Sequence, residues 1–339
     1  MFLNTVLYAV LHFLVDLVCA WAMFSFYIEG NYENLLIYNF CAFALQMPFG
    51  TLLDLLKDRM RRLPATVAAL GAMITVVGSL MHPAVLGIGN ALFHVGGGVD
   101  VMEEDIMTHK KGKALGLFVA PGAIGLYVGT LISKGFQNMT VPICSALCMA
   151  VLLYLLFRFG NEPKRQMQEA EAPGWGNGIP IFCCFLVVVL RSWVGLAVSF
   201  QWKAFASFAA LAVFAAAAGK FCGGLLAARF GIRSTAAVSL LLAAVCYLAA
   251  DIPMFGIAAV FLFNMSMPLT LWLVGKMLPH LAGFSFGLLT FGLFLGFLPV
   301  YAQVQVPISG AITGALGSVI SCVLLIIGGK AAKYDEIPA

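Results

Sequence analysis

Charged side chains are scarce in this chain of 339 residues. Only 10% of the residues are Asp, Glu, Lys or Arg, whereas soluble globular proteins carry about a quarter. So few charges cannot cover a water-soluble surface, and a hydrophobic content of 62% with a mean hydropathy of +0.99 indicates a protein whose main solvent is a lipid bilayer. The net charge of +4 comes from short connectors rather than from one face, which argues against a nucleic-acid partner.

Several other signals are also missing. No Lys or Arg precedes Lys57, and the first apolar run contains Asp16, so we expect a retained membrane anchor instead of a cleaved signal peptide. The nine cysteines include no CxxC and no Cys/His spacing suited to zinc, so we expect no disulfide framework, no metal and no cofactor. No HExxH and no nucleophile motif occurs, so the chain is predicted not to be an enzyme.

Long apolar runs dominate what is present. About 20 apolar residues cross a bilayer as a helix, and the chain contains twelve runs of this kind. They fall near 4–28, 34–56, 64–81, 84–102, 114–134, 139–158, 179–200, 204–228, 234–250, 254–275, 282–302 and 306–328. Only the charged connector 159–178 is long. We therefore predict an all-α membrane protein with 12 transmembrane helices, divided into a six-helix bundle at 1–158, a cytoplasmic linker at 159–178 and a second bundle at 179–339.

The two predicted bundles repeat each other. Gly50 and Gly224 each begin a segment that closes an apolar run and opens a basic one, and they lie 224 − 50 = 174 positions apart. The same offset pairs Asn90 with Asn264. A repeat of half the chain length is typical of transporters built from two pseudo-symmetric bundles, with the substrate site where the repeats meet.

The basic residues predict the orientation in the membrane. Fifteen of the 19 Lys and Arg residues fall on one side of the predicted spans. Under the positive-inside rule this side is cytoplasmic, and an even number of spans puts both termini there. We expect a multi-pass protein of the cell inner (plasma) membrane that acts as a monomer, with the lipid bilayer, a small-molecule substrate and protons as its partners.

Polar residues within the first and fourth spans predict a proton site. Asn4, Tyr8, His12 and Asp16 recur every four residues and so share one helix face. A charged residue in mid-bilayer costs about 2.5–3.5 kcal/mol, so this face is expected to meet a cavity or another helix. His94 lies in the fourth span. We predict that Asp16, with His12 or His94, carries the coupling proton; packing is the alternative role for the two histidines.

The second half supplies cations. Arg191 lies midway through the seventh span and Lys220 lies within the eighth, so we predict that both bind an anionic substrate group. Asn90, Gln46 and Asn264 are expected to add neutral hydrogen bonds. The alternative is that Asp16 and Arg191 form a structural ion pair between the bundles.

The ends of the spans suggest a conformational latch. Gly50, Asp54 and Arg59 lie at the cytoplasmic end of the second span, and Arg229 and Gly231 follow the eighth. Charged contacts between helices here would bias which side of the protein is open. The acidic run at 103–105 is expected to be a solvated helix end. Pro121 within the fifth span predicts a helix kink, and the glycines around it predict close helix packing.

These features resemble the major facilitator superfamily over essentially the whole chain. GTLLDLLKDRMRR and GGLLAARFGIRS are similar to the two copies of its loop motif, although Leu55 stands where Arg is usual and Ala228 replaces the acidic residue. LFVAPGAIG resembles its fifth-span antiporter motif. HFLVD at 12–16, the run ending at His94, and VLRSWVG around Arg191 resemble the fosmidomycin-resistance branch of drug exporters, which implies site roles for Asp16, His94 and Arg191.

Sequence and resemblance together predict a secondary active transporter. The resemblance implies proton-coupled efflux of a small polar or anionic drug or metabolite by alternating access. Electrostatics permits the alternative, proton-coupled uptake of an organic anion, because protonation of Asp16 would free Arg191 to bind an anion. Two other functional classes are possible alternatives for such a chain: an intramembrane enzyme that uses His94 and Asp16, and a non-transporting receptor or assembly factor. Short connectors argue against docking a soluble partner.

Overall fold

Helices dominate the computed structural model, which describes residues 2–57, 59–60, 62–160, 177–304 and 308–331. No strand occurs within these ranges, so the predicted all-α fold class is confirmed. Residues 161–176, which make up most of the predicted linker, lie outside the described residues.

The helices follow the predicted spans closely. In chain order they are α1 (Phe2–Ala22), α2 (Glu33–Asn39), α3 (Gln46–Leu56), α4 (Leu63–Gly78), α5 (Pro83–Met107), α6 (Lys113–Ser133), α7 (Thr140–Phe159), α8 (Gly178–Ala197), α9 (Ala206–Phe230), α10 (Ile232–Leu248), α11 (Pro253–Asn264), α12 (Ser266–Met277), α13 (Ala282–Tyr301) and α14 (Gly310–Ala331). Ten helical segments among the described residues are long and apolar enough to cross a bilayer. The shorter apolar helices α4 and α10 correspond to the third and ninth predicted spans.

The contacts divide the chain into two units. Unit 1 contains residues 1–104, 117–166 and 280–291, and unit 2 contains residues 105–116, 167–279 and 292–339. The division therefore falls within three helices, α5, α6 and α13. The two units are described separately below.

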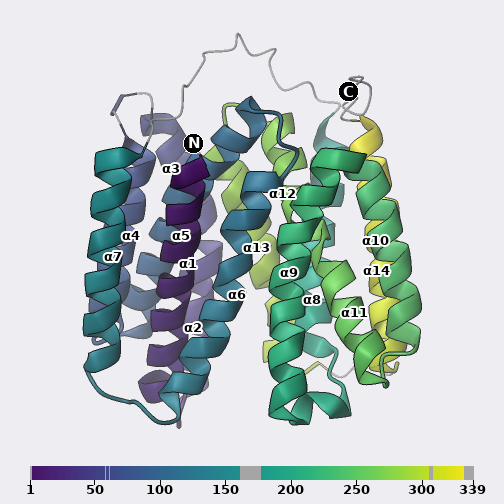
Figure 1. Ribbon diagram of the computed structural model, residues 1–339, viewed down its shortest axis with the longest axis horizontal. Coiled ribbons are helices and arrows are strands. Elements are labelled where there is room, and N and C mark those ends of the chain that lie inside the picture. The colour runs from purple at the N-terminus through teal and green to yellow at the C-terminus, as the bar shows by residue number, and fades with distance from the viewer. Residues whose placement is uncertain (1, 58, 61, 161–176, 305–307, 332–339) are drawn as a thin grey trace. The chain divides into compact units, whose positions relative to one another are not determined.

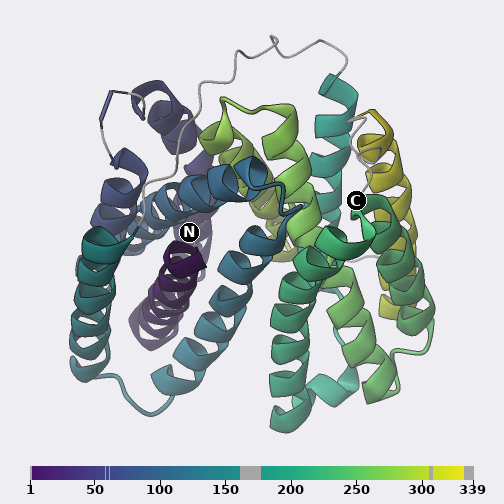
Figure 2. The same ribbon diagram turned by 45° about the horizontal axis from the view of Figure 1, so that its top comes forward.

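Helix α1 is largely buried within unit 1. It lies between α6 and α7 in both views (Figures 1 and 2). Gly122, Gly125 and Gly129 of α6 face α1, and a Cβ atom at any of them would collide with atoms of α1. The absence of side chains at these positions allows the two backbones to approach closely, as small residues do in membrane helices. The predicted role of glycine in this span is confirmed.

Unit 2 contains a similar close pair. Helices α10 and α14 lie side by side in both views (Figures 1 and 2). Gly314 of α14 packs directly against the ring of Tyr247 in α10, and a side chain at residue 314 would displace that ring. Pro180 of α8 packs near Gly328 at the other end of α14.

Two π-helical segments change the helix register in unit 1. One covers Met23–Tyr27 after α1, and the other covers Phe40–Ala44 between α2 and α3. The second segment separates Asn39 from Gln46, which a regular helix would place on one face. Gln46 is fully buried, whereas Asn39 is half-buried and donates a hydrogen bond to the Leu35 carbonyl at 2.8 Å. The two side chains therefore lie in different surroundings.

Candidate functional site

The polar face of α1 is buried against other helices of unit 1. Asn4, Tyr8, His12 and Asp16 are all buried. The hydroxyl of Tyr8 donates a hydrogen bond to Asp100 of α5 at 2.6 Å. The prediction that this stripe meets another helix is confirmed, and its main partner is α5.

At mid-helix the stripe forms a buried cluster of His12, Asp16 and His94. The Nε2 atoms of the two histidines lie 2.8 Å apart, with their rings nearly perpendicular. His12 Nε2 lies 3.1 Å from one Asp16 carboxylate oxygen, and His94 Nε2 lies 3.8 Å from the other. Three predicted proton-coupling residues are therefore side by side.

A backbone carbonyl oxygen binds the Nδ1 atom of each imidazole ring. His12 Nδ1 lies 2.8 Å from the carbonyl oxygen of Phe118 in α6. His94 Nδ1 lies 2.8 Å from the carbonyl oxygen of Asn90, one turn earlier in α5. Since each ring is bound at both nitrogens, its orientation is fixed.

Asn90 is the fourth member of the cluster. Its side-chain amide donates a hydrogen bond to Asp16 at 3.0 Å and contacts the Cys19 sulfur at 3.5 Å. Its amide oxygen is buried and has no hydrogen-bond partner among the described residues. Asn90 was predicted to bind substrate, and the structure places it against the carboxylate of Asp16.

On the side opposite α5, the cluster packs against the backbone of Gly122 in α6. A Cβ atom at Gly122 would collide with His12 Nε2 and with the Asp16 carboxylate. Pro121 precedes it within α6 and has no N–H to donate to the Leu117 carbonyl. The kink predicted at Pro121 stays a prediction.

The cluster also has the spacing of a metal site. Two imidazole nitrogens and one carboxylate oxygen from His12, His94 and Asp16 lie within 4.8 Å of one another. It is the one such group found within the described ranges. At metal centres the ring nitrogen that does not bind the metal is commonly hydrogen-bonded, as the Nδ1 atoms are here. Such a bond also fixes the orientation of a histidine that transfers protons.

Arg191 is buried in unit 2. It lies on α8 with 8% of its surface exposed. Its guanidinium donates to the Met267 sulfur of α12 at 3.4 Å, and its Nε has no hydrogen-bond partner in the described part of the chain. A guanidinium has five N–H donors, and a thioether is a weak acceptor. This side chain is therefore poorly satisfied by the groups around it.

The other predicted substrate residues lie in different surroundings. Lys220 is half-buried on α9, and its carbonyl packs against Gly116. Asn264 ends α11 and donates to the Val260 carbonyl at 2.9 Å. In unit 1, Gln46 donates to the Ala42 carbonyl at 2.6 Å, while its buried amide oxygen has no partner among the described residues. Gln46 therefore retains a free acceptor.

Asp54 joins two helices of unit 1. Its carboxylate accepts hydrogen bonds from the backbone N–H groups of Gly283 and Phe284 at 2.9 and 2.8 Å. These residues form the first turn of α13, where the helix dipole favours a negative charge. Gly50 lies one turn before Asp54, and a Cβ atom at Gly50 would collide with the backbone of Gly283. The α3–α13 contact depends on both residues.

Lys57 completes this junction, and the sequence prediction missed it. Its ammonium lies 2.9 Å from Asp54 and 2.8 Å from Glu103 of α5, and it also donates to the His280 carbonyl at 3.3 Å. Burial alone would lower the pKa of Lys57, but Glu103 and Asp54 outweigh burial and raise the pKa above its usual value. Because Lys57 stands in a basic run of the sequence, it was predicted only as one of the residues that set the orientation in the membrane.

The remaining predicted latch residues are more peripheral. Arg59 is exposed after α3. In unit 2, Arg229 is exposed and its guanidinium carbon lies 5.4 Å from the centre of the Phe230 ring. Gly231 joins α9 to α10 with φ of +85°, a conformation that glycine adopts without strain.

The acidic end of α5 differs from its prediction. Residues 103–105 were expected to form a solvated helix end, but Glu104 and Asp105 are buried. In unit 2, Asp105 accepts hydrogen bonds from the backbone N–H groups of Gly112 and Leu115, both at 2.9 Å. In unit 1, Thr5 donates weakly to Glu104 at 3.4 Å. The expectation was wrong because α5 continues to Met107, so these carboxylates have partners on neighbouring segments.

Asp100 and Glu104 were also missed as partners of the α1 stripe. They are four residues apart and therefore share a face of α5, which is the signal that could have found them. The predicted span ended at residue 102, and this boundary divided the pair.

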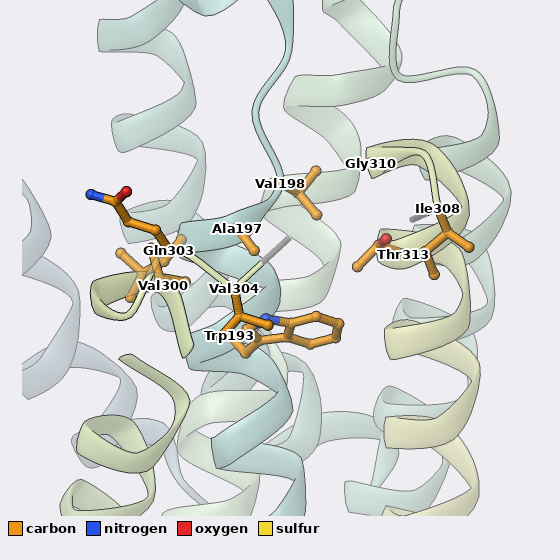
Figure 3. Close-up of a pocket in the computed structure, with 10 residues that line it drawn as sticks. Trp193, Ala197, Val198, Val300, Gln303, Val304, Ile308, Gly310 and Thr313 are labelled. Atoms are coloured by element: carbon orange, nitrogen blue, oxygen red, sulfur yellow. The ribbon is translucent and has the colours of Figure 1, made fainter. Parts of the chain in front are cut away.

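A separate cavity of about 390 Å³ lies in unit 2 (Figure 3). It is lined by residues of α8, α13 and α14, such as Trp193 and Thr313, and of the segment between α13 and α14, such as Gln303. Figure 3 shows Trp193 below and Thr313 to the right. No charged side chain occurs among its described lining residues. None of the predicted substrate residues lines it, so it does not explain the buried Arg191.

The sequence matches no known family model and no curated protein. The fold, however, is similar to that of solved structures. A variant of the Escherichia coli fucose:proton symporter FucP aligns with a TM-score of 0.65 and 15% identity over 97% of each chain. A structure of FucP described as a major facilitator superfamily transporter in the outward conformation gives a TM-score of 0.65 and 14% identity over 96% of this chain and 99% of that one. An identity this low shows the fold alone, and the chain has the fold of the major facilitator superfamily.

Proposed function

We propose that this protein is a proton-coupled secondary transporter of a small anionic compound, working by alternating access in the cell inner membrane. The fold supports a transporter because such folds carry a site at mid-membrane depth between two bundles. The similar FucP structures include one named as a fucose:proton symporter. We also propose the division into bundles at 1–158 and 179–339, a cytoplasmic linker, and cytoplasmic termini.

Arg191 is the observation that carries the proposal of an anionic substrate. A cation in mid-bilayer costs about 2.5–3.5 kcal/mol and normally has a partner. Among the described residues, Arg191 has no ion pair and only a sulfur acceptor. A carboxylate or phosphonate would supply the missing acceptors in a bidentate arrangement. Lys220 is proposed to add positive charge, and Gln46 and Asn264 to add neutral hydrogen bonds.

The sign of the charges favours co-transport. The cluster of His12, Asp16 and His94 is one charge more positive with a coupling proton than without it. We propose that the proton site and the anion site are coupled, so that a bound proton strengthens anion binding and an anion strengthens proton binding to the same degree. Proton and anion would then cross together, as in uptake by symport.

Efflux by proton exchange is the second candidate. It is supported by the resemblance of HFLVD at 12–16 and of the segment around Arg191 to fosmidomycin-resistance exporters. Exchange requires substrate and proton to compete, so the substrate would need a cationic or zwitterionic group that pairs with Asp16.

A two-step experiment tests both directions. Thermal shift of the purified protein against phosphonates, carboxylates and cationic drugs at two pH values identifies a ligand. The protein is then placed in vesicles with a pH-sensitive dye inside, and the ligand is added outside. Co-transport acidifies the interior, whereas exchange makes it more alkaline. A bound ligand that moves in neither direction, with no proton flux, would contradict a transporter.

A further inference from the structure

The hydrogen bonds around His12 and His94 fix how many protons the two rings hold. Each Nδ1 atom lies 2.8 Å from a backbone carbonyl oxygen, of Phe118 for His12 and of Asn90 for His94. A carbonyl oxygen can only accept a hydrogen bond. Both Nδ1 atoms must therefore carry hydrogen, which leaves only the two Nε2 atoms to be assigned.

The two Nε2 atoms lie 2.8 Å from each other. If neither carried hydrogen, two lone pairs would face each other at hydrogen-bond distance. If both did, two N–H groups would collide. We infer that the two Nε2 atoms share one proton, so that the His12–His94 pair is the binding site of the coupling proton and Asp16 is its counter-ion; the coupling role rests on the proposed function.

The charges around the pair agree with this inference. One shared proton makes the pair a single cation, and Asp16 Oδ2 lies 3.1 Å from His12 Nε2. The Asn90 amide donates to Asp16 Oδ1, which favours the ionised carboxylate. One cation beside one anion is the arrangement in which buried charge is least costly.

The other titratable groups described near the pair lie on α1, α2 and α5. Besides Asp16, α1 contributes Tyr8, whose hydroxyl is bonded to Asp100 of α5, and the Cys19 thiol beside Asn90. Buried Tyr38 of α2 lies near Cys19. Helix α6 contributes Phe118 and the Gly122 backbone, which are uncharged.

The same geometry selects the coupling ion. Sodium binds through oxygen atoms, whereas the atoms that face each other here are two imidazole nitrogens. The nitrogens lie 2.8 Å apart, which is a hydrogen-bond distance, whereas two nitrogens bonded to one tetrahedral zinc ion at about 2.0–2.1 Å would lie about 3.3–3.4 Å apart. The site therefore takes a proton and excludes sodium.

Release of the proton must change the structure locally. Without it, two lone pairs remain 2.8 Å apart beside an unbalanced carboxylate. The rings must then separate, and they belong to different helices, α1 and α5. Proton load would therefore bind these helices together, and its loss would loosen them.

Nitrogen-15 NMR of histidine-labelled protein tests the proton count without any transport measurement. The chain has five histidines, so His82→Gln, His109→Gln and His280→Gln leave His12 and His94 as the only labels. At neutral pH we expect both Nδ1 atoms to carry hydrogen and both Nε2 atoms to show averaged, half-protonated shifts. Two neutral rings without a shared proton, or a ring protonated at Nε2 alone, would overturn the inference.

Two variants refine the test. His94→Gln should remove the averaged Nε2 signal and leave His12 neutral. Asp16→Asn removes the counter-ion and should release the shared proton at neutral pH. The background protein without either variant is the control, because the exposed His82→Gln change within it removes only the hydrogen bond that His82 accepts from the Ala84 N–H. If the averaged signal survives Asp16→Asn unchanged, Asp16 is not the counter-ion.

Ion measurements complete the experiment. Elemental analysis of the purified protein should find no stoichiometric zinc, and one zinc per chain would overturn the proton assignment. In vesicles, choline in place of sodium should leave transport unchanged. His12→Gln or His94→Gln should remove the effect of pH on substrate affinity, on the order of 5–150-fold. A shared proton in a protein that transports nothing would contradict the proposed function but not the proton count.

Discussion

Two buried charges in this molecule have opposite surroundings. Asp16, in unit 1, lies beside His12 and accepts a hydrogen bond from Asn90. Arg191, in unit 2, has one sulfur contact and a buried Nε without a partner among the described residues. The two are equally buried, so burial alone does not distinguish them.

The difference separates two kinds of binding site. A charge surrounded by fixed partners can change only by gaining or losing a proton, which needs no extra space. A guanidinium with unused donors can be satisfied by a larger group that arrives from outside. Under the proposed function the proton would bind in unit 1 and the anion in unit 2, and each of the following variants tests one side of this comparison.

Arg191→Gln should have the largest effect. Loss of a bidentate, charge-assisted contact should weaken binding of the anionic ligand roughly a hundredfold, ~3 kcal/mol. Ligand titration in detergent measures this directly. Arg158→Gln is the matched control, because Arg158 is exposed at the end of α7. Unchanged affinity in a correctly inserted Arg191→Gln protein would remove Arg191 from the substrate site.

Asp16→Asn should uncouple the two sites. The variant should still bind the anion at Arg191, but the pH dependence of that binding, on the order of 5–150-fold, should disappear. Binding measured from acid to neutral pH gives the comparison. Normal accumulation driven by a pH gradient in the variant would contradict the assignment of the proton to this cluster.

Lys220→Gln should have a smaller and selective effect. A half-buried lysine acts as a point charge, so its loss should weaken an anionic ligand by about tenfold and a neutral analogue of similar size much less. Competition binding with the two compounds measures the ratio. Equal losses for both would indicate a structural role for Lys220.

Lys57→Met should affect stability more than binding. It removes the cation between Asp54 and Glu103, at a cost of about 3 kcal/mol for breaking a buried pair. Because these carboxylates raise the Lys57 pKa, its contribution is complete below the usual value of 10.5 and is lost only as pH rises through the higher folded value. Thermal unfolding should therefore show a constant difference between about pH 6 and about pH 9. A difference that vanishes within this range would contradict the pairing.

Sequence predicted the helices well because length and hydropathy are local properties. The α1 stripe was equally accessible, since Tyr8, His12 and Asp16 recur at the period of a helix. The partners of that stripe were harder to predict. His94 and Asn90 were found because polar residues in an apolar span are conspicuous, whereas Asp100 and Glu104 fell at a span boundary.

Other features depend on contacts between distant segments. The hydrogen bonds from Gly283 and Phe284 to Asp54 join residues more than 200 positions apart, and no local pattern in α3 announces them. Lys57 resembled the arginines around it until its two carboxylate partners were seen. The π-helical segment at Phe40–Ala44 also escaped prediction, because one extra residue per turn leaves no mark in an apolar run.

Gly122 sets how the proton cluster can be altered experimentally. Its backbone is the wall against which His12 and Asp16 rest, so even the methyl group of Gly122→Ala would meet both of them. A single added carbon would therefore press on the proton cluster from the α6 side while changing no charge and removing no hydrogen-bonding group. Gly122→Ala would thus separate the effect of packing around the cluster from the effect of its titratable groups, all of which stay in place.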